Sequence, residues 1–327
     1  MSQKFTSTSI PEPSLYLSIL TETLIVTGPI FLIVLLGLVL RRIGFIDDHF
    51  NQIASRLVFS ICLPVLLFTT ISQINLGETI NFPVFYFSLA GAVGGFALSW
   101  LMAARIEPRA DRGVVVQGAF RSNLGVIGLA LCANAYGAPG LALASLLMAS
   151  LTVSYNILSV FILSFYANTE LDWRSVLLDI AKNPLIIAIV LAFAVAFFGL
   201  RVPGILLSTG DYVGSMALPL ALLGTGAGMS LRALRDSSQA TGLVIGLKAF
   251  LLPALLTVTA VQLGFRGTDL GVLFLLFVSP TATASYAMVK AMGANDTLAA
   301  NLVMTTTLVC ILSCSVGLFL LKVFELA

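Results

Sequence analysis

The sequence has few charged residues and a single histidine. Only 10% of its 327 residues are Asp, Glu, Lys or Arg, whereas 58% are hydrophobic. A soluble globular domain carries about 25% charged residues, so the charges here are too few to cover a soluble surface. The net charge of +2 is spread thinly, and no basic cluster points to a nucleic-acid partner. The composition indicates a polytopic membrane protein whose surroundings are the lipid bilayer.

The sequence also lacks the motifs of disulfide, metal and enzyme sites. Cys62, Cys132, Cys310 and Cys314 lie in apolar stretches without C-x-x-C spacing, which argues against a disulfide framework or a zinc site. No H-E-x-x-H, G-x-S-x-G or P-loop sequence is present. We therefore expect no enzyme, no cofactor and no metal site. Coupling of the protein's activity to protons or to sodium stays open.

Long apolar runs are what the sequence does contain, and they predict an all-α protein with ten transmembrane helices. Each run must be helical, because an unpaired backbone group in lipid costs several kcal/mol. The predicted spans are 17–40, 51–72, 82–103, 114–137, 140–166, 184–200, 208–230, 240–264, 269–291 and 297–322.

The cations between these spans fall mainly on one side of the membrane, which predicts the orientation. Ten lie on one side: Arg41, Arg42, Arg105, Arg109, Arg112, Arg174, Lys182, Arg232, Arg235 and Lys290. Four lie on the other: Lys4, Arg201, Arg266 and Lys322. Cytoplasmic loops carry the excess of Lys and Arg. Both termini are therefore expected outside, in a membrane of the bacterial inner type.

The predicted spans divide into two halves of five. An outer tail (1–16) precedes the first half (17–166), a cytoplasmic linker (167–183) follows it, and an outer tail (323–327) follows the second half (184–322). An odd number of helices per half inserts the second half upside down, which is an inverted repeat. Leu63-Pro64 in the second span and Leu218-Pro219 in the seventh support the match. Proline frees a carbonyl and kinks a helix.

The candidate site lies where the fourth and ninth spans are interrupted, since inverted-repeat transporters bind substrate at such breaks near mid-depth. Arg121 and Asn123 would lie about 11–14 Å deep in a core about 30 Å thick. Ser279-Pro280 interrupts the ninth span at a similar depth. Predicted substrate-binding residues are Arg121, Asn123, Ser279, Pro280, Thr281, Ser285 and Lys248, and predicted hinge positions are Pro64, Pro219, Gly118 and Gly125.

Two of these residues have an alternative interpretation. Arg121 can bind a carboxylate with two parallel hydrogen bonds, or it can satisfy the carbonyls of the broken helix as a structural arginine. Lys248 can face a site, or its chain can snorkel to the membrane surface.

No Asp or Glu falls at mid-depth in any predicted span. A cation–proton antiporter needs buried carboxylates to carry its ions, so this class is excluded. The only charges expected near the middle are cationic, which favours an anionic or neutral substrate.

Several motifs together resemble one family of carriers. They are Arg41-Arg42-Ile43-Gly44-Phe45, Arg121-Ser122-Asn123-Leu124-Gly125-Val126-Ile127-Gly128, Asn183-Pro184-Leu185-Ile186, Lys248-Ala249-Phe250-Leu251-Leu252-Pro253 and Pro280-Thr281-Ala282. On these motifs the chain resembles the auxin efflux carrier family, in its bacterial malate and malonate permease branch, within the group of bile-acid-symporter-like folds.

The resemblance implies a scaffold domain, a transport domain, crossing helices 4 and 9, an elevator-like cycle and carriage of organic acids. It also implies one departure. Many relatives have an amide shortly after the second motif, where this chain has Ala284 beside Ser285.

The sequence thus predicts a secondary active permease for small organic anions, such as dicarboxylates or auxin-like weak acids. Two alternatives remain at this stage. One is a sodium-coupled, bile-acid-like symporter of organic anions, and the other is a membrane ligand sensor without transport. The oligomeric state is open as well, with a homodimer among the alternatives.

Overall fold

A computed structural model describes residues 13–73, 82–167, 174, 178, 181–229 and 239–327. All regular secondary structure within these segments is helical, as the sequence predicted. Most of the expected N-terminal tail and of the linker 167–183, together with Arg232 and Arg235, lies outside the described residues.

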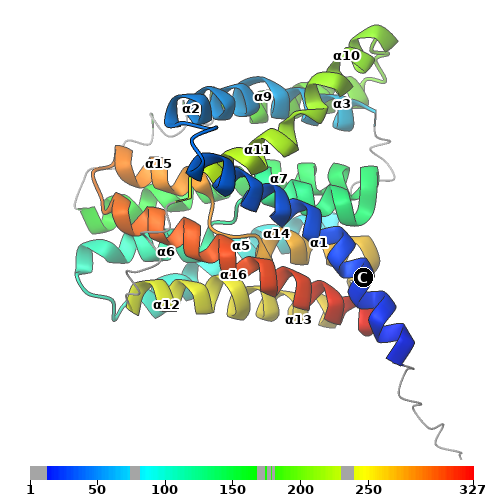
Figure 1. Ribbon diagram of the computed structural model, residues 1–327. Helices are drawn as coiled ribbons and strands as arrows, with labels where there is room; N and C mark the ends of the chain where they lie inside the picture. The colour runs from blue at the N-terminus through cyan, green and yellow to red at the C-terminus, as the bar shows by residue number, and fades with distance from the viewer. Residues whose placement is uncertain (1–12, 74–81, 168–173, 175–177, 179–180, 230–238) are drawn as a thin grey trace, which may run out of the picture.

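The helices follow one another with short connections (Figure 1). In chain order they are α1 (Pro13–Arg42), α2 (Asp48–Leu57), the π-helix η1 (Val58–Cys62), α3 (Leu63–Ser72), α5 (Phe82–Ala103), the 3-10 turn η2 (Arg109–Asp111), α6 (Arg112–Phe120), the π-helix η3 (Leu124–Gly128), α7 (Leu129–Ala167), α9 (Pro184–Phe197), α10 (Gly204–Ser215), α11 (Ala217–Ala227), α12 (Gln239–Ile245), the π-helix η5 (Gly246–Leu251), α13 (Leu252–Gln262), α14 (Gly267–Val278), α15 (Thr283–Ala291) and α16 (Asp296–Val323).

Seven helical stretches in the described segments are long and apolar enough to cross a membrane. They are Tyr16–Arg42, Asp48–Ser72, Phe82–Ala103, Leu124–Tyr166, Gly204–Ala227, Gln239–Gln262 and Asp296–Val323. Pro184–Phe197 and Gly267–Val278 are shorter apolar helices. The stretch Leu124–Tyr166 has 43 residues, about twice what one crossing needs. Its backbone leaves the helical conformation at Gly137 (φ 62°, ψ −148°), a geometry that glycine adopts at little cost.

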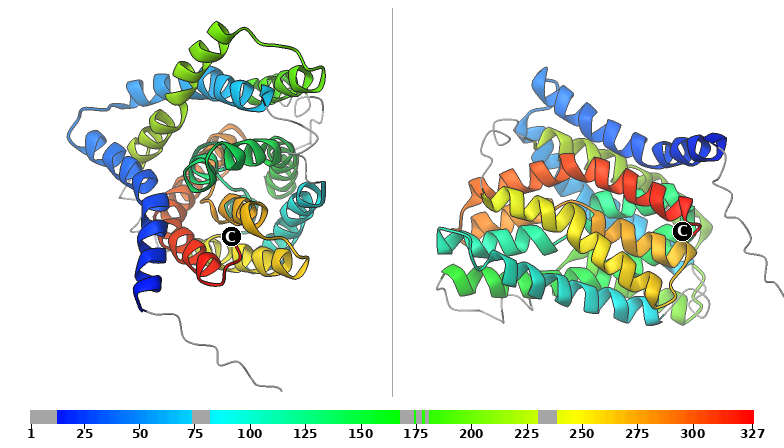
Figure 2. Two further views of the ribbon diagram at one scale, coloured as in Figure 1. Left: turned by 90° about the vertical axis from the view of Figure 1, so that its right-hand side faces the viewer. Right: turned by 90° about the horizontal axis from the view of Figure 1, so that it is seen from below.

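The helices pack in two groups (Figures 1 and 2). In the first group α1 packs along α11, and α3 packs against α9 and α10. The second group holds α5, α6, α7 and α12 to α16. The two groups meet chiefly where α1 lies along α16 and where α3 and α1 touch α7.

The close packing of α1 on α11 depends on glycine. A Cβ atom on Gly226 would overlap the Val34 carbonyl oxygen, and one on Gly37 would overlap that of Leu223. Small residues allow helix backbones to approach in this way in membranes.

Two of the predicted hinge positions are prolines at irregular points of helices. Pro64 follows η1, in which the helix widens to π-type bonding. A proline ring clashes with the carbonyl four residues earlier, and the wider turn relieves that clash. Pro219 is the third residue of α11, directly after the turn at Met216 that separates α11 from α10.

Candidate functional site

Two non-helical segments lie against each other in the interior of the second group of helices. In the first segment α6 ends at Phe120, Arg121 is extended (φ −81°, ψ 106°), and helical structure resumes at Leu124. In the second segment α14 ends at Val278, Ser279 is non-helical (φ −54°, ψ 141°), and α15 begins at Thr283. Pro280 explains the second ending, because a residue before proline is disfavoured in the helical conformation.

Backbone hydrogen bonds join the two segments. Ser122 and Thr281 form an isolated antiparallel bridge. The Asn123 N–H donates to the Pro280 carbonyl at 2.7 Å, and the Ala282 N–H donates to the Arg121 carbonyl at 3.1 Å. Backbone groups that are left unpaired where each helix ends therefore find partners in the other segment, as a membrane interior requires.

Side chains hold the same junction. The Thr281 hydroxyl donates to the Gly118 carbonyl at 2.6 Å, and the Thr281 N–H donates to the Thr306 hydroxyl at 3.1 Å. At Gly118 a Cβ atom would lie only 2.7 Å from Leu302 Cδ1. The end of α6 can therefore reach this position because residue 118 has no side chain.

Arg121 is buried in this interior, and none of the described residues gives it an acidic partner. Its side chain is 7% exposed. Its Nη2 donates to Asn156 Oδ1 at 2.7 Å, and its Nη1 donates to Ser159 Oγ at 3.2 Å and toward Met288 Sδ at 3.6 Å. The salt bridges found within the described segments are Arg41–Asp48, Arg112–Glu107 and Lys322–Glu22. The guanidinium charge is thus solvated by neutral groups and remains uncompensated.

A cavity of about 380 Å³, here called the arginine cavity, lies beside Arg121. Arg121, Ser122, Asn123 and Gly125 line it from the first segment, and Ala282, Thr283 and Ala284 from the second. The helices that start at Leu124 and Thr283 both begin at its wall. Helix N-termini carry about half a positive charge each. In the described chain Asn123 Nδ2 is buried without a hydrogen-bond partner.

The far wall of the arginine cavity comes from other helices. Met148, Thr152, Tyr155 and Asn156 of α7 contribute to it, as do Phe59 of η1 and Asn183 and Leu185 at the start of α9. Both groups of helices therefore line it.

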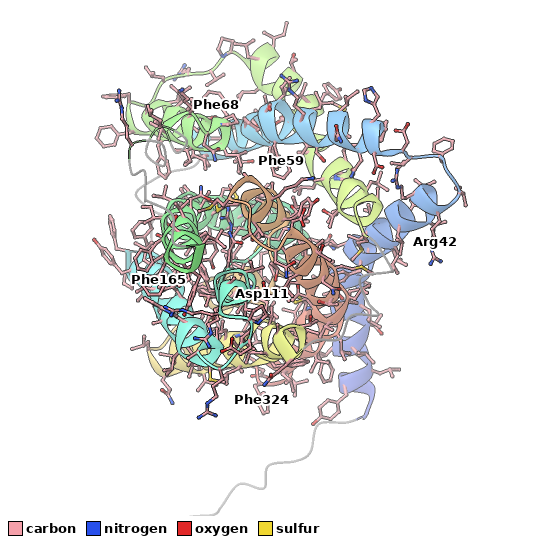
Figure 3. The ribbon with its side chains drawn as sticks, turned by 90° about the vertical axis from the view of Figure 1, so that its left-hand side faces the viewer. Arg42, Phe59, Phe68, Asp111, Phe165 and Phe324 are labelled. Carbon is pink, nitrogen blue, oxygen red and sulfur yellow. The ribbon has the colours of Figure 1, made fainter. Side chains whose placement is uncertain are left out.

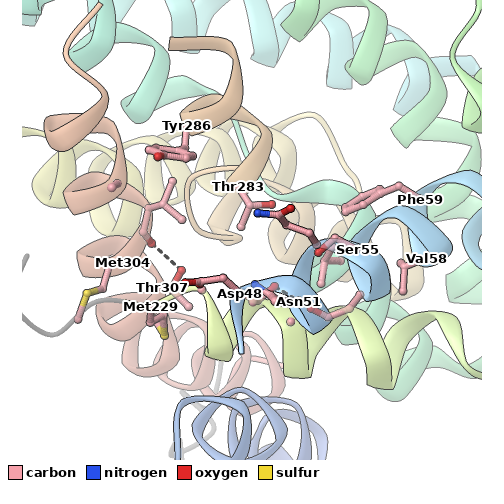
Figure 4. A pocket seen from close by; sticks show the side chains of 18 of the residues that line it. Asp48, Asn51, Ser55, Val58, Phe59, Met229, Thr283, Tyr286, Met304 and Thr307 are labelled. Carbon is pink, nitrogen blue, oxygen red and sulfur yellow. Dashed lines mark hydrogen bonds between the residues drawn. The ribbon is translucent and has the colours of Figure 1, made fainter. Parts of the chain in front are cut away.

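A second cavity of about 560 Å³, the tyrosine cavity, adjoins the first, since Phe59 and Thr283 line both. Figure 4 shows Tyr286 and Thr283 facing Asn51 and Ser55 of α2 across it. Asp48 and Lys290 also line it. Arg41 pairs with Asp48 at 2.7 Å. α2 and α15 lie toward the left-hand end of the molecule in Figure 1. Figure 3 views the molecule from that side and labels Arg42, the last residue of α1, and Asp111 of η2.

The structure brings only part of the predicted site residues to a cavity. Arg121, Asn123 and Gly125 line the arginine cavity, whereas Ser279, Pro280, Thr281, Ser285 and Gly118 are packed behind it. The Ser279 hydroxyl donates a hydrogen bond to the Leu275 carbonyl at 2.7 Å. Pro64 lines a separate lateral groove with α9 and α10.

Lys248 does not snorkel to the surface. It lies in η5, is 1% exposed, and its Nζ donates to the Ser122 hydroxyl. The lysine itself does not line the arginine cavity, but Ser122 does.

Sequence reasoning missed the wall that α7 provides. Tyr155, Asn156 and Ser159 follow Thr152 by three, four and seven residues, so the four polar side chains share one face of the helix. That polar stripe was a usable signal.

Comparison with known proteins identifies the family. The family described as "Membrane transport protein" matches residues 24–173 and 168–318. An uncharacterized transporter of Methanothermobacter thermautotrophicus is 25% identical over 265 residues, covering 80% of this chain and 85% of its own. An uncharacterized transporter of Methanocaldococcus jannaschii is 25% identical over 216 residues, covering 63% and 68%. The chain therefore belongs to the membrane transport protein family, the auxin efflux carriers, and is an integral membrane protein of the transporter class.

Proposed function

We propose that this protein is a secondary active transporter of small organic anions that binds its substrate in the arginine cavity. The observation that carries the proposal is the buried guanidinium of Arg121, which has no acidic partner in the described chain. An unpaired charge buried in a membrane protein is costly. An anion that enters the cavity would remove that cost and would gain affinity from it.

The rest of the cavity wall suits the same ligand. Two helix N-termini meet there, and N-termini bind anions through free N–H groups and the helix dipole. No Asp or Glu is among the described residues that line it. Asn123 supplies an unused amide donor. A volume of about 380 Å³ lies in the usual range for small-molecule sites.

Two groups of helices with cavities between them support an elevator-type cycle. α1, α2, α3, α9, α10 and α11 would form the scaffold, and the remaining helices would move against it. The tyrosine cavity has α2 and α11 on one side and α15 and α16 on the other, so sliding of one group would open or close it. On the predicted orientation this cavity faces the cytoplasm, with both termini outside the bacterial inner membrane.

The proposal includes ten membrane crossings in two inverted halves, 17–166 and 184–322. The two non-helical segments then occupy equivalent places, in the fourth and the ninth crossing. Two observations support this division: the segments pair with each other, and the two family matches meet at residues 168–173, within the linker.

Dicarboxylates and auxin-like weak acids are the substrates that we would test. Uptake of labelled malate, malonate and indole acetate would be measured in proteoliposomes, for the wild type and for Arg121→Gln. Arg56→Gln is the matched control, because Arg56 is exposed on α2. We expect saturable uptake of one acid by the wild type and the control, and none by Arg121→Gln.

Full uptake by a folded Arg121→Gln would contradict the role of Arg121. Repeating the assay without sodium tests the alternative of a sodium-coupled symporter, since uptake that needs sodium would favour it. Binding of an acid without flux into sealed vesicles would favour a ligand sensor.

A further inference from the structure

Lys248 is a second buried cation near the junction, and the binding of an anion by Arg121 does not require it. Its side chain is 1% exposed and lies in η5 between α12 and α13. Its Nζ donates to the hydroxyl of Ser122. Ser122 also lines the arginine cavity, so a single hydroxyl separates the amine from the space where the anion would bind.

Within the described part of the chain Lys248 forms no salt bridge, and the carboxylate of α16, Asp296, lies in the first turn of that helix. The helices packed against η5 are α6, α12, α13, α14 and α16. α16 carries the buried thiols of Cys310 and Cys314. α12 and α13 contain no charged residue, and the charged residues of α6 and α14, Arg112 and Asp269, lie in the first turns of those helices. Arg121, the residue before Ser122, is a second cation at the same junction.

The contact between Lys248 and Ser122 is compatible with both protonation states of the amine. A serine hydroxyl accepts a hydrogen bond from an ammonium group and can donate one to a neutral amine. The protonated form is costly while the cavity holds no anion, because two cations then share a poorly hydrated interior. An anion in the cavity reverses this balance, since a negative charge nearby favours the ammonium form.

We infer that Lys248 is the proton-binding site that couples proton uptake to anion binding, so that one proton is carried with each anion. The inference rests on the proposed function. The amine takes its proton from water in the cavity when the anion binds, and returns it to water when the anion leaves. By linkage, protonation must strengthen anion binding as much as the anion strengthens protonation.

Calorimetric titration of the purified full-length protein with malonate tests this inference. The titration is run between pH 7.5 and pH 9 in two buffers of different ionisation enthalpy, which gives the protons taken up per anion. At the alkaline end the wild type should take up about one proton per anion, and its affinity should fall by up to about tenfold per pH unit.

Three variants separate the lysine's charge from its titration. Lys248→Gln should show no proton uptake and a weak affinity that pH does not change. Lys248→Arg keeps a permanent charge, so it should show no proton uptake but retain its affinity at pH 9. Ser122→Ala, which leaves the lysine in place, should reduce the pH dependence by more than half. Lys322→Gln, in the last turn of α16 where Lys322 pairs with Glu22, should behave as the wild type.

Anion binding by the wild type without proton uptake would overturn the inference and leave the proposed function standing. The same proton uptake in folded Lys248→Gln would also overturn it. Failure of the wild type to bind malate, malonate or indole acetate would contradict the proposed function itself, and this inference with it.

Discussion

The two non-helical segments that meet in the interior have the same backbone role but different side chains. The first, Arg121 to Asn123, projects a guanidinium and an amide toward the arginine cavity. The second, Ser279 to Ala282, is packed tightly, and Thr281 fastens it to Gly118 of α6. In the proposed function, the first segment therefore supplies the ligand-binding side chains, and the second supplies the fixed backbone against which they are positioned.

The difference shows how a polar site can be built in a membrane at a limited energetic cost. Polar backbone at mid-depth is tolerated only where protein groups or a water-filled cavity satisfy it. Here the paired segments satisfy each other, which leaves the side chains of the first segment free to face a ligand. Changes to the first segment should therefore affect transport, whereas changes to the second should affect stability first.

The largest effect on transport should come from Asn156→Asp. The change places a carboxylate where Asn156 Oδ1 now accepts from Arg121 at 2.7 Å. The new ion pair would neutralise the guanidinium and exclude the anionic substrate. We expect uptake in proteoliposomes to fall by at least about 100-fold, since a buried charge pair changes binding by several kcal/mol.

Asn156→Ala is the matched control for that prediction. It removes the same hydrogen bond without adding a negative charge, and it should keep a measurable part of the uptake. Equal losses in the two variants would argue that Asn156 orients Arg121 and that the uncompensated charge is unimportant.

Thr281→Val should destabilise the second segment. Valine keeps the shape of threonine but cannot donate to the Gly118 carbonyl, which would leave a buried acceptor unpaired. The expected cost is about 1–3 kcal/mol, measured as a lower midpoint of thermal unfolding in detergent. Thr209→Val is the control, because the exposed Thr209 hydroxyl bonds only within its own helix. A Thr281→Val protein as stable as the control would disprove the fastening role.

Gly118→Ala should also destabilise the protein, by a different route. The added Cβ would meet Leu302 Cδ1 at 2.7 Å, and overpacking of this kind costs about 1–3 kcal/mol. Combining it with Leu302→Ala should restore part of the loss. At Gly242 of α12 an added Cβ meets no atom within 4 Å, so Gly242→Ala should leave the unfolding midpoint unchanged or raise it. A lower unfolding midpoint for the Gly242→Ala protein would contradict this explanation.

Ala284→Asn should have the smallest effect, and it places an amide in the first turn of α15, directly after the second segment. Ala284 lines the arginine cavity, so an amide there could donate to the substrate. One added hydrogen bond of about 0.5–1.5 kcal/mol changes affinity by about two- to twelvefold. The measurement is the ratio of malonate uptake to indole acetate uptake, with Ala282→Ser as a polar control. An unchanged ratio would mean that the side chain at position 284 does not contact the substrate.

Much of the architecture could be predicted from the sequence, because the length of an apolar run and the position of a helix-breaking residue are local properties of the chain. The helical membrane character and the family were predicted and are confirmed. The run around Arg121 and the Ser279-Pro280 step were singled out from sequence, and both are non-helical in the structure. The number of ten crossings and the roles of the site residues remain predictions.

The sequence did not predict in the same way which side chains line the two cavities. Ser279, Thr281 and Ser285 were expected to bind substrate, yet they are packed away from both cavities. Asn156 and Asn183 were not expected, although both line the arginine cavity. Whether a polar side chain faces a cavity or a neighbouring helix depends on the rotation of that helix in the bundle, which many distant contacts set together.

The sequence by itself determined that this chain is helical, lies in a membrane and belongs to a transporter family, and it predicts cations but no carboxylates near mid-depth. Composition and apolar run length fix the helical and membrane character, because lipid leaves the backbone no alternative to helix in a chain of this kind. The family follows from the sequence motifs and from the family match. Only the tertiary structure decided that Arg121 borders a cavity with no acidic partner among the described residues, and that Lys248 is joined to that cavity through Ser122. Those relations connect residues more than 30 positions apart, and packing alone brings them together.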